Sequence, residues 1–179
     1  MTVLPHSRPD EVASEEFQTV LQQATGIWFD GGRQWRFVDA YEGTVAVELF
    51  RDVLRRGGVI GGSSAGATIQ GEYLVRGHPL GNTVMMAEGY ERGFGFLPGV
   101  AIDQHFSQRG RRPDLLPVIA RHRQLLGIGI DEGTALVVNR TAEIIGEHSA
   151  FFLRHQNSRK NCRIRRTMTH GLLCGSAVW

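Results

Sequence analysis

The stretch that says most about the fold is Val59-Ile60-Gly61-Gly62-Ser63-Ser64-Ala65-Gly66-Ala67. Two β-branched residues predict a short strand, and the small residues after them predict a sharp turn into a helix reaching Leu74. Inside the turn, residues 62–66 match the G-x-S-x-G pattern of a nucleophile elbow, which exposes its central serine on a strained backbone. Glycine-rich turns also bind phosphate, or bind nothing. The flanking strand and helix favour catalysis, with Ser64 as the nucleophile.

Short apolar strands alternate with amphipathic helices on both sides of this stretch. The expected helices are 11–24, 44–56 and 114–124, the expected strands are 26–29, 59–60, 100–102, 126–130, 134–138 and 143–145, and 76–98 is an expected surface excursion. This alternation predicts an α/β fold whose mostly parallel sheet is covered on both faces. Functional residues in such sheets follow the carboxyl ends of strands. Four places satisfy that rule: Gly31-Gly32, Ser63-Ser64, Asp103 to His105, and Asp131-Glu132.

Composition narrows the class of protein. The chain has 179 residues, of which 41% are hydrophobic and 21% charged, as in ordinary globular proteins. It contains no apolar run of membrane-spanning length and no signal-peptide pattern at its start, so we expect a cytoplasmic protein that spans no membrane. Two cysteines, Cys162 and Cys174, form neither a disulfide framework nor a zinc pattern. We therefore expect no metal and no cofactor.

Charge divides the chain unevenly. Residues 150–179 carry six basic residues and no acidic one, so the rest of the chain is mildly acidic although the net charge is +2. We expect one α/β domain over 1–149 and a basic tail over 150–179, with no structure assigned to the tail. The tail lacks the aromatic platforms and motifs of nucleic-acid-binding proteins, so we expect no nucleic-acid partner.

A nucleophilic serine needs a base within hydrogen-bond reach, and the base needs an orienting acid. Among seven histidines, only His105 ends a strand in the part of the chain that carries the motif. Glu132 follows the expected strand 126–130 and is the candidate acid, with Asp131 as the near alternative. An Asp-Glu-Gly sequence is also ordinary turn chemistry. The spacing therefore leaves the choice of acid open.

Three arginines follow the candidate base: Arg109, Arg111 and Arg112. Guanidinium groups pair with carboxylates through two parallel hydrogen bonds, so this cluster could hold an acidic substrate. A solvated arginine-rich loop is the alternative interpretation.

Five segments, in this order along the chain, resemble cyanophycinase, a family of serine peptidases related to aspartyl dipeptidase (dipeptidase E). The segments are IWFDGGRQ (27–34), GGSSAGA (61–67), GFGFLPG (93–99), DQHFSQRGR (103–111) and LGIGIDE (126–132). The resemblance extends over residues 11–148. It implies a three-layer αβα sandwich of the class I glutamine-amidotransferase-like (flavodoxin-like) type. The family begins with a further strand-helix-strand portion, so the resemblance also implies an N-terminally truncated version of that fold.

The resemblance assigns a role to each matching residue. Ser64 would be the nucleophile, His105 the base and Glu132 its orienting acid, while the backbone N–H groups of Gly32 and Ala65 would form the oxyanion hole. The matching substrate-pocket positions are Gln34, Asp103, Gln104, Arg109 and Arg111.

The implied substrate is cyanophycin, a polyaspartate whose side-chain carboxyls carry arginine, cleaved to β-Asp-Arg dipeptides; relatives suggest a homodimer. Two other functions stay open at this point. One is a dipeptidase of the same fold acting on Asp-X or isoaspartyl dipeptides. The other is an inactive fragment that binds or assembles without catalysis.

Overall fold

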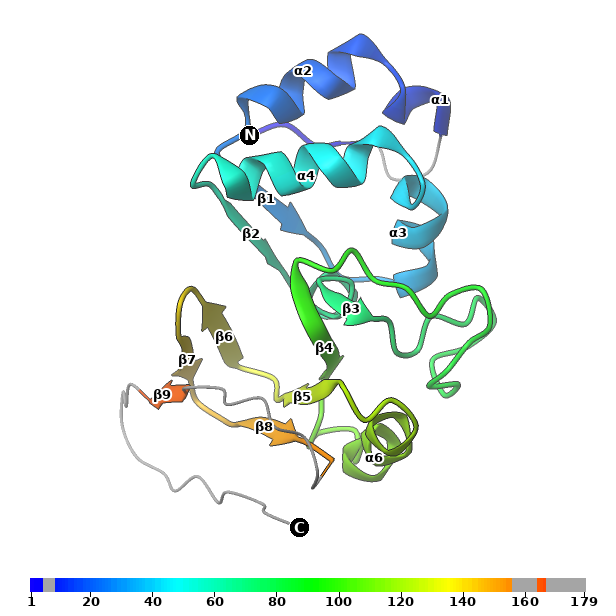
Figure 1. The fold of residues 1–179 in the computed structure, drawn as a ribbon, viewed down its shortest axis with the longest axis vertical. Helices are drawn as coiled ribbons and strands as arrows, with labels where there is room; N and C mark the ends of the chain where they lie inside the picture. Colours follow the sequence, from blue (N-terminus) through cyan, green and yellow to red (C-terminus); the bar gives the residue numbers. More distant parts are fainter. Residues whose placement is uncertain (5–8, 156–163, 167–179) are drawn as a thin grey trace. The chain divides into compact units, whose positions relative to one another are not determined.

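The computed structural model of the chain describes residues 1–4, 9–155 and 164–166 (Figure 1). The chain forms two compact units, Met1–Pro98 and Gly99–Trp179, and each is described by itself. Of the residues considered above, both cysteines and most of the basic tail lie outside the described residues. Within the described ranges, every helix is too short or too polar to cross a membrane.

The first unit is built mainly from helices around a two-stranded parallel sheet. Its elements are α1 (Pro9–Val12), α2 (Glu15–Gln23), β1 (Gly26–Phe29), α3 (Gln34–Tyr41), α4 (Val45–Arg55), β2 (Val59–Gly62), α5 (Ala65–Thr68) and β3 (Gly71–Tyr73). Strands β1 and β2 pair in parallel, with Gly26 opposite Val59 and Phe29 opposite Gly62. The turns that follow these two strands therefore leave from the same edge of the sheet.

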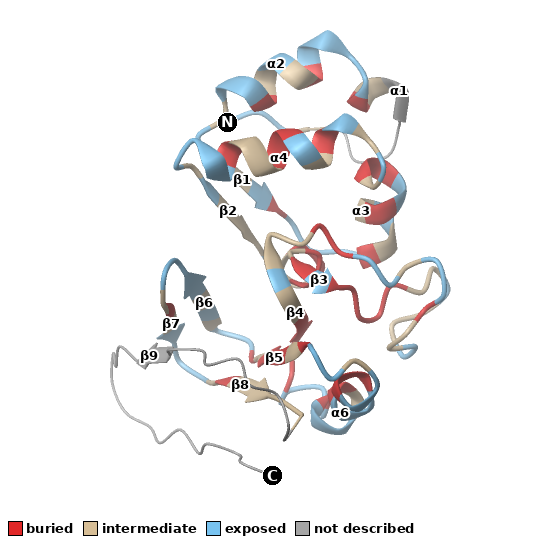
Figure 2. Ribbon diagram, in the orientation of Figure 1, coloured by how far each residue is buried: buried red, intermediate tan, exposed pale blue. Residues whose placement is uncertain are grey.

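Aromatic packing holds α3 and α4 on this sheet. The ring of Phe29, which is 4% exposed at the end of β1, has its centroid 5.6 Å from that of Phe37 and 5.2 Å from that of Phe50. Both contacts are edge-to-face, the geometry that the ring quadrupole favours. Figure 2 shows the buried residues of α3 and α4 in red. Phe29 is the last residue of β1, so the hydrophobic core reaches the residue directly before the turn that follows this strand.

The expectation that 76–98 is a surface excursion is wrong for part of the segment. Phe94 is 2% exposed and its ring centroid lies 5.6 Å from that of Phe29. Its backbone N–H donates to the carbonyl of Ile69 at 2.8 Å. The segment has little regular secondary structure, so its sequence shows no hydrophobic period, yet it supplies an aromatic side chain to the core.

Two expected helices also differ from the structure. The helix expected over 11–24 is interrupted, because α1 ends at Val12. Ser14, whose backbone is extended, then caps α2 through its Oγ, which accepts from Phe17 N at 3.2 Å. The helix expected to reach Leu74 ends at Thr68, and the chain then forms β3. In both places a local turn replaces a helix that hydrophobic spacing alone would continue.

Tyr41 gives a prediction about stability. It is 4% exposed between the rings of Phe17 and Phe50, and burial raises its pKa to about 12. Because the folded protein holds this proton more tightly than the unfolded chain, the stabilisation is complete below pH 10 and is lost as the pH rises toward 12. Phenylalanine has no hydroxyl to titrate, so the Tyr41→Phe variant should not lose this contribution. Between pH 8 and pH 11 we expect the free energy of unfolding to fall by about 1 kcal/mol less in Tyr41→Phe than in the parent. Urea unfolding of both proteins at the two pH values measures this, and equal losses would contradict it.

The second unit contains most of β4 (Leu97–Gln104) and all elements after it. These are α6 (Arg112–Arg121), β5 (Leu126–Ile130), β6 (Thr134–Val138), β7 (Ala142–Gly146), β8 (Ala150–Leu153) and β9 (Ile164–Arg166). Strand β4 pairs in parallel with β5, and β5 pairs antiparallel with β8. Strand β7 pairs antiparallel with β6 and parallel with β9. Taken with β1–β2, these pairings give a mixed α/β fold with mostly parallel sheets, as the sequence predicts.

The core of the second unit centres on Phe106, which is fully buried. Its ring centroid lies 5.5 Å from that of Phe151 on β8. It also covers Gly129 on β5, where an added Cβ would lie 2.3 Å from the Phe106 ring. A side chain at position 129 would displace the ring that anchors the loop after β4. Helix α6 packs on the same sheet through Leu115 and Ile119, which approach Gly127.

Candidate active site

Ser64 lies between β2 and α5 with φ 52° and ψ −113°. Positive φ is uncommon for a residue with a side chain and costs of order 1–3 kcal/mol, so the surrounding structure must hold it. Among the described residues, the non-glycine residues with positive φ are Ser64, Arg76 and His105. Two of these three are candidate catalytic residues. Backbone strain is therefore concentrated where the sequence predicts chemistry.

The glycines of the elbow are required by close backbone packing. A Cβ on Gly62 would lie 2.4 Å from the carbonyl oxygen of Gly66, and a Cβ on Gly66 would lie 1.9 Å from the carbonyl oxygen of Phe29. These distances are far below van der Waals contact, so the first turn of α5 lies directly against the end of β1. The turn that carries Ser64 can form only because both positions lack a side chain.

The candidate oxyanion donors belong to the same unit as Ser64. Gly32 has φ +138°, which favours glycine, and a Cβ on neighbouring Gly31 would lie 3.6 Å from Ser64 Cβ. The turn after β1 therefore runs beside the elbow. Ala65 is the first residue of α5, where backbone N–H groups have no acceptor within the helix. Both N–H groups thus come from segments adjacent to Ser64.

Gln34, a predicted substrate-pocket residue, begins α3 directly after this turn. Its side chain is 2% exposed, and Nε2 has no hydrogen-bond partner among the described residues. Buried amide nitrogens are nearly always hydrogen-bonded. A donor of this kind, two residues after Gly32, is suited to a ligand oxygen.

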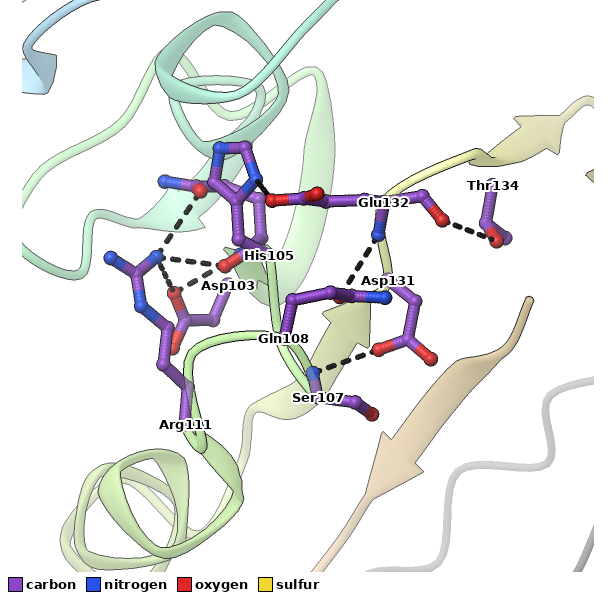
Figure 3. Close-up of polar contacts among 9 residues, drawn as sticks. Asp103, His105, Ser107, Gln108, Arg111, Asp131, Glu132 and Thr134 are labelled. Carbon is purple, nitrogen blue, oxygen red and sulfur yellow. Dashed lines mark hydrogen bonds and ion pairs between the residues drawn. The ribbon is translucent and has the colours of Figure 1, made fainter. Parts of the chain in front are cut away.

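His105 and Glu132 meet in the second unit (Figure 3). Because β4 and β5 are parallel with Gln104 opposite Ile130, the residues that follow these strands emerge side by side. His105 Nδ1 lies 2.6 Å from Glu132 Oε1, with the two side chains 23% and 51% exposed. A carboxylate at this distance fixes the ring orientation and stabilises a proton on Nδ1. The other ring nitrogen, Nε2, is then the position that can accept a proton.

Asp131, the alternative acid, has a different set of contacts. Its Oδ1 accepts from Ser107 N at 2.9 Å and its Oδ2 from Ser149 N at 3.4 Å. It is 7% exposed, whereas Glu132 extends toward His105. Glu132 therefore pairs with the histidine, whereas Asp131 accepts hydrogen bonds from backbone N–H groups.

Three of the remaining predicted pocket residues, Asp103, Gln104 and Arg111, form a buried cluster at the end of β4. Arg111 is 4% exposed, and its Nη1 donates to the carbonyl oxygen of Gln104 at 2.7 Å, to Gln104 Oε1 at 3.1 Å and to Asp103 Oδ1 at 3.3 Å. Arg109 is exposed, and the guanidinium carbon of Arg112 lies 4.1 Å from the ring centroid of Phe151. Of the three arginines, Arg111 is thus buried, whereas Arg109 and Arg112 are exposed.

The structure groups the predicted site residues within each unit. Gly32, Gln34, Ser64 and Ala65 lie around the elbow of the first unit. The others lie at the ends of β4 and β5 in the second unit: Asp103, Gln104, His105, Arg109, Arg111 and Glu132. Sequence reasoning did not single out Gln108, whose Oε1 accepts from Glu132 N at 3.1 Å. The feature of the sequence that points to Gln108 is its position three residues after the candidate base, His105.

An α/β fold with a nucleophile elbow and a histidine–glutamate pair, each at the carboxyl ends of parallel strands, is the arrangement of serine hydrolases. The model of peptidase family S51 matches residues 4–145. The chain belongs to this family.

Curated relatives agree with this assignment. The chain is 34% identical over 137 residues to a cyanophycinase from Geminocystis herdmanii, covering 74% of this chain and 50% of the relative. It is 33% identical over 148 residues to a cyanophycinase from Trichormus variabilis, covering 78% of this chain and 48% of the relative. The chain thus spans about half the length of the curated relatives it matches.

Solved structures show the same fold. A peptidase from an acI-B1 Actinobacterium matches with a TM-score of 0.66 and 23% identity, over 89% of this chain and 66% of that one. A candidate peptidase E from Listeria monocytogenes EGD-e matches with a TM-score of 0.51 and 18% identity, over 81% of this chain and 68% of that one. At these identities the likeness concerns the fold alone.

Proposed function

We propose that this protein is a serine peptidase that hydrolyses cyanophycin to β-Asp-Arg dipeptides. The observation that carries the proposal is the 2.6 Å contact between His105 Nδ1 and Glu132 Oε1. His105 is the candidate base of the sequence analysis, and Glu132 is one of its two candidate acids. The strained backbone of Ser64 in the elbow supports the same reaction class. The substrate class is supported by relatives named cyanophycinase at 33–34% identity.

In the proposed reaction, Ser64 Oγ attacks the carbonyl carbon of a peptide bond between two aspartates. His105 takes the hydroxyl proton on Nε2, because Nδ1 is directed at Glu132. The negative charge that develops on the carbonyl oxygen is bound by the N–H groups of Gly32 and Ala65. His105 then protonates the leaving amine, and water repeats the cycle on the acyl-enzyme. The reaction requires Ser64 Oγ and His105 Nε2 to come within hydrogen-bond distance in the active protein.

The substrate carries carboxylates and guanidinium groups, and the proposed pocket offers partners for both. Exposed Arg109 would bind a substrate carboxylate by a bidentate pair. The unpartnered Nε2 of Gln34 would donate to a substrate oxygen. The other proposed pocket residues are Asp103, Gln104 and Arg111.

The substrate class is tested by offering the purified chain insoluble cyanophycin, Asp-X dipeptides and isoaspartyl dipeptides in parallel, with products followed by liquid chromatography and mass spectrometry. We expect release of β-Asp-Arg from cyanophycin. Hydrolysis of the dipeptides but not of cyanophycin would instead indicate a dipeptidase of the same fold. No hydrolysis by a folded, monodisperse sample would leave the inactive-fragment interpretation.

Glu132→Gln tests the orienting acid. We expect kcat to fall about 10²–10⁴-fold with KM little changed, because the neutral amide no longer stabilises the protonated ring that forms in the transition state. The matched control is Glu147→Gln, an exposed glutamate of the same unit, which is expected to retain kcat. Equal kcat values for the parent and Glu132→Gln would remove Glu132 from the mechanism.

A further inference from the structure

Two segments meet around the His105–Glu132 pair. The histidine loop, residues 105–110, follows β4, and the acidic turn, residues 131–133, follows β5. Two hydrogen bonds join them in opposite directions (Figure 3): Ser107 N donates to Asp131 Oδ1 at 2.9 Å, and Glu132 N donates to Gln108 Oε1 at 3.1 Å. Each segment thus supplies a side-chain oxygen that binds the backbone of the other.

Asp131 fixes the acidic turn to the rest of the unit. Besides accepting from Ser107 N, its carboxylate accepts from Ser149 N at 3.4 Å, and its own N–H donates to Ser149 O at 3.1 Å. The side chain is 7% exposed, so these charge-assisted bonds are largely shielded from water. Because β8 begins at the residue after Ser149, Asp131 links the acidic turn to β8 as well as to the histidine loop.

Gln108 fixes the residue that holds the histidine. Its Oε1 binds the backbone N–H of Glu132, the residue whose carboxylate lies 2.6 Å from His105 Nδ1. The histidine loop needs such support because His105 has φ 50°, a conformation that is unfavourable unless its surroundings impose it. The half-exposed Glu132 side chain is otherwise free to choose among several rotamers. A fixed backbone restricts where its carboxylate can reach.

We propose that Gln108 and Asp131 are positioning residues that hold Glu132 against His105 by tying the histidine loop to the acidic turn. Neither residue touches the reacting atoms. The consequence for catalysis rests on the proposed function, whereas the consequence for the geometry of the histidine–glutamate pair does not. Displacement of a catalytic group by about 1 Å can lower a rate about 10²-fold, so loss of either bond should be measurable.

The first test reads the geometry directly, by nitrogen NMR of the ¹⁵N-histidine-labelled chain at pH 9, with the His105 signals assigned from a His105→Gln variant. In the parent we expect the His105 proton on Nδ1, facing Glu132. In Glu132→Ala we expect it on Nε2. Gln108→Met and Asp131→Asn should shift the His105 signals at least a third of the way toward those of Glu132→Ala. Gln124→Met, at an exposed glutamine of the same unit, is the matched control and should leave them unchanged.

The second test measures hydrolysis of cyanophycin. Gln108→Met and Asp131→Asn are expected to lower kcat about 10-fold with KM within about two-fold of the parent, while Gln124→Met retains both. A raised KM with unchanged kcat would mean that the two residues bind substrate and would overturn the proposal. Parent-like His105 signals in a folded Gln108→Met variant would overturn it too. If Asp131→Asn fails to fold, Gln108→Met decides, because Gln108 is exposed.

The two proposals can fail separately. If the parent hydrolyses no peptide, the proposed function fails while the NMR comparison still decides whether Gln108 and Asp131 position the pair. If the parent is active and the variants match it in both tests, the positioning roles fail and the proposed function stands.

Discussion

Ser64→Ala is expected to lower the rate of cyanophycin hydrolysis by at least about 10³-fold. Without the hydroxyl no acyl-enzyme can form, and only binding and the oxyanion donors remain to favour the reaction. The fold should be unaffected, because alanine fits the space that serine occupies at the end of β2. Initial rates of β-Asp-Arg release, with circular dichroism of both proteins, measure the effect.

Ser63→Ala is the matched control, because it removes a hydroxyl from the adjacent residue. Ser63 Oγ lies 3.3 Å from Asp30 Oδ1, on the exposed side of the turn. We expect this variant to keep its hydrolysis rate within about ten-fold of the parent. A Ser64→Ala protein that loses no more activity than Ser63→Ala would show that Ser64 is not the nucleophile.

Gly66→Ala is expected to have the largest effect on stability. The new Cβ would lie 1.9 Å from the carbonyl oxygen and 2.4 Å from the carbonyl carbon of Phe29, both of which are backbone atoms held by the β1–β2 pairing. Relief requires α5 to move away from β1. We expect destabilisation by about 3 kcal/mol or more, which is a large share of the stability of an ordinary domain. Thermal unfolding followed by circular dichroism measures it.

Gly26→Ala is the control for that experiment. It adds the same methyl group at the beginning of β1, where the Cβ would lie 3.6 Å from the carbonyl oxygen of Val59, an ordinary contact. Its midpoint of unfolding should stay within a few degrees of the parent's. If Gly66→Ala unfolded at the same temperature as Gly26→Ala, the close packing of the elbow on β1 would be wrong.

The strands show how much of the fold local sequence can predict. The predicted bounds 26–29, 126–130 and 134–138 coincide with β1, β5 and β6. These are short apolar runs that end at Asp30, Asp131 and Asn139, residues that favour turns. Strand β2 is two residues longer than predicted, because Gly61 and Gly62 pair with Trp28 and Phe29. Glycine carries no strand signal of its own, so that extension depends on the partner strand.

The sequence did not predict helix α3 (Gln34–Tyr41), because this helix, like the extension of β2, depends on contacts with other segments. Its N-cap, Arg33, makes no side-chain capping bond, and the helix has only eight residues. Short helices without a cap are stable only through tertiary packing, which here is supplied by Val38 and Tyr41. The division of the first helix was better signalled, since Ser14 followed by Glu15 and Glu16 is a favourable helix start.

The candidate site was predictable up to the choice between neighbouring residues. The rule about carboxyl ends of strands located His105 and Asp131-Glu132, because β4 and β5 end directly before them. It could not distinguish Glu132 from Asp131, since both follow the same strand. That distinction depends on Ser107 and Ser149, whose N–H groups occupy the Asp131 carboxylate. Such contacts arise between segments and have no signature in a single sequence.

Covalent labelling of the parent chain by a fluorophosphonate, with the modified peptide identified by mass spectrometry, tests the proposed triad most directly. We predict a single modified residue, Ser64, and a labelling rate that falls at least about 100-fold in His105→Ala, because the histidine activates the hydroxyl. Modification at another residue would show that Ser64 is not the nucleophile. Labelling of Ser64 that is as fast without His105 as with it would show that His105 is not its base.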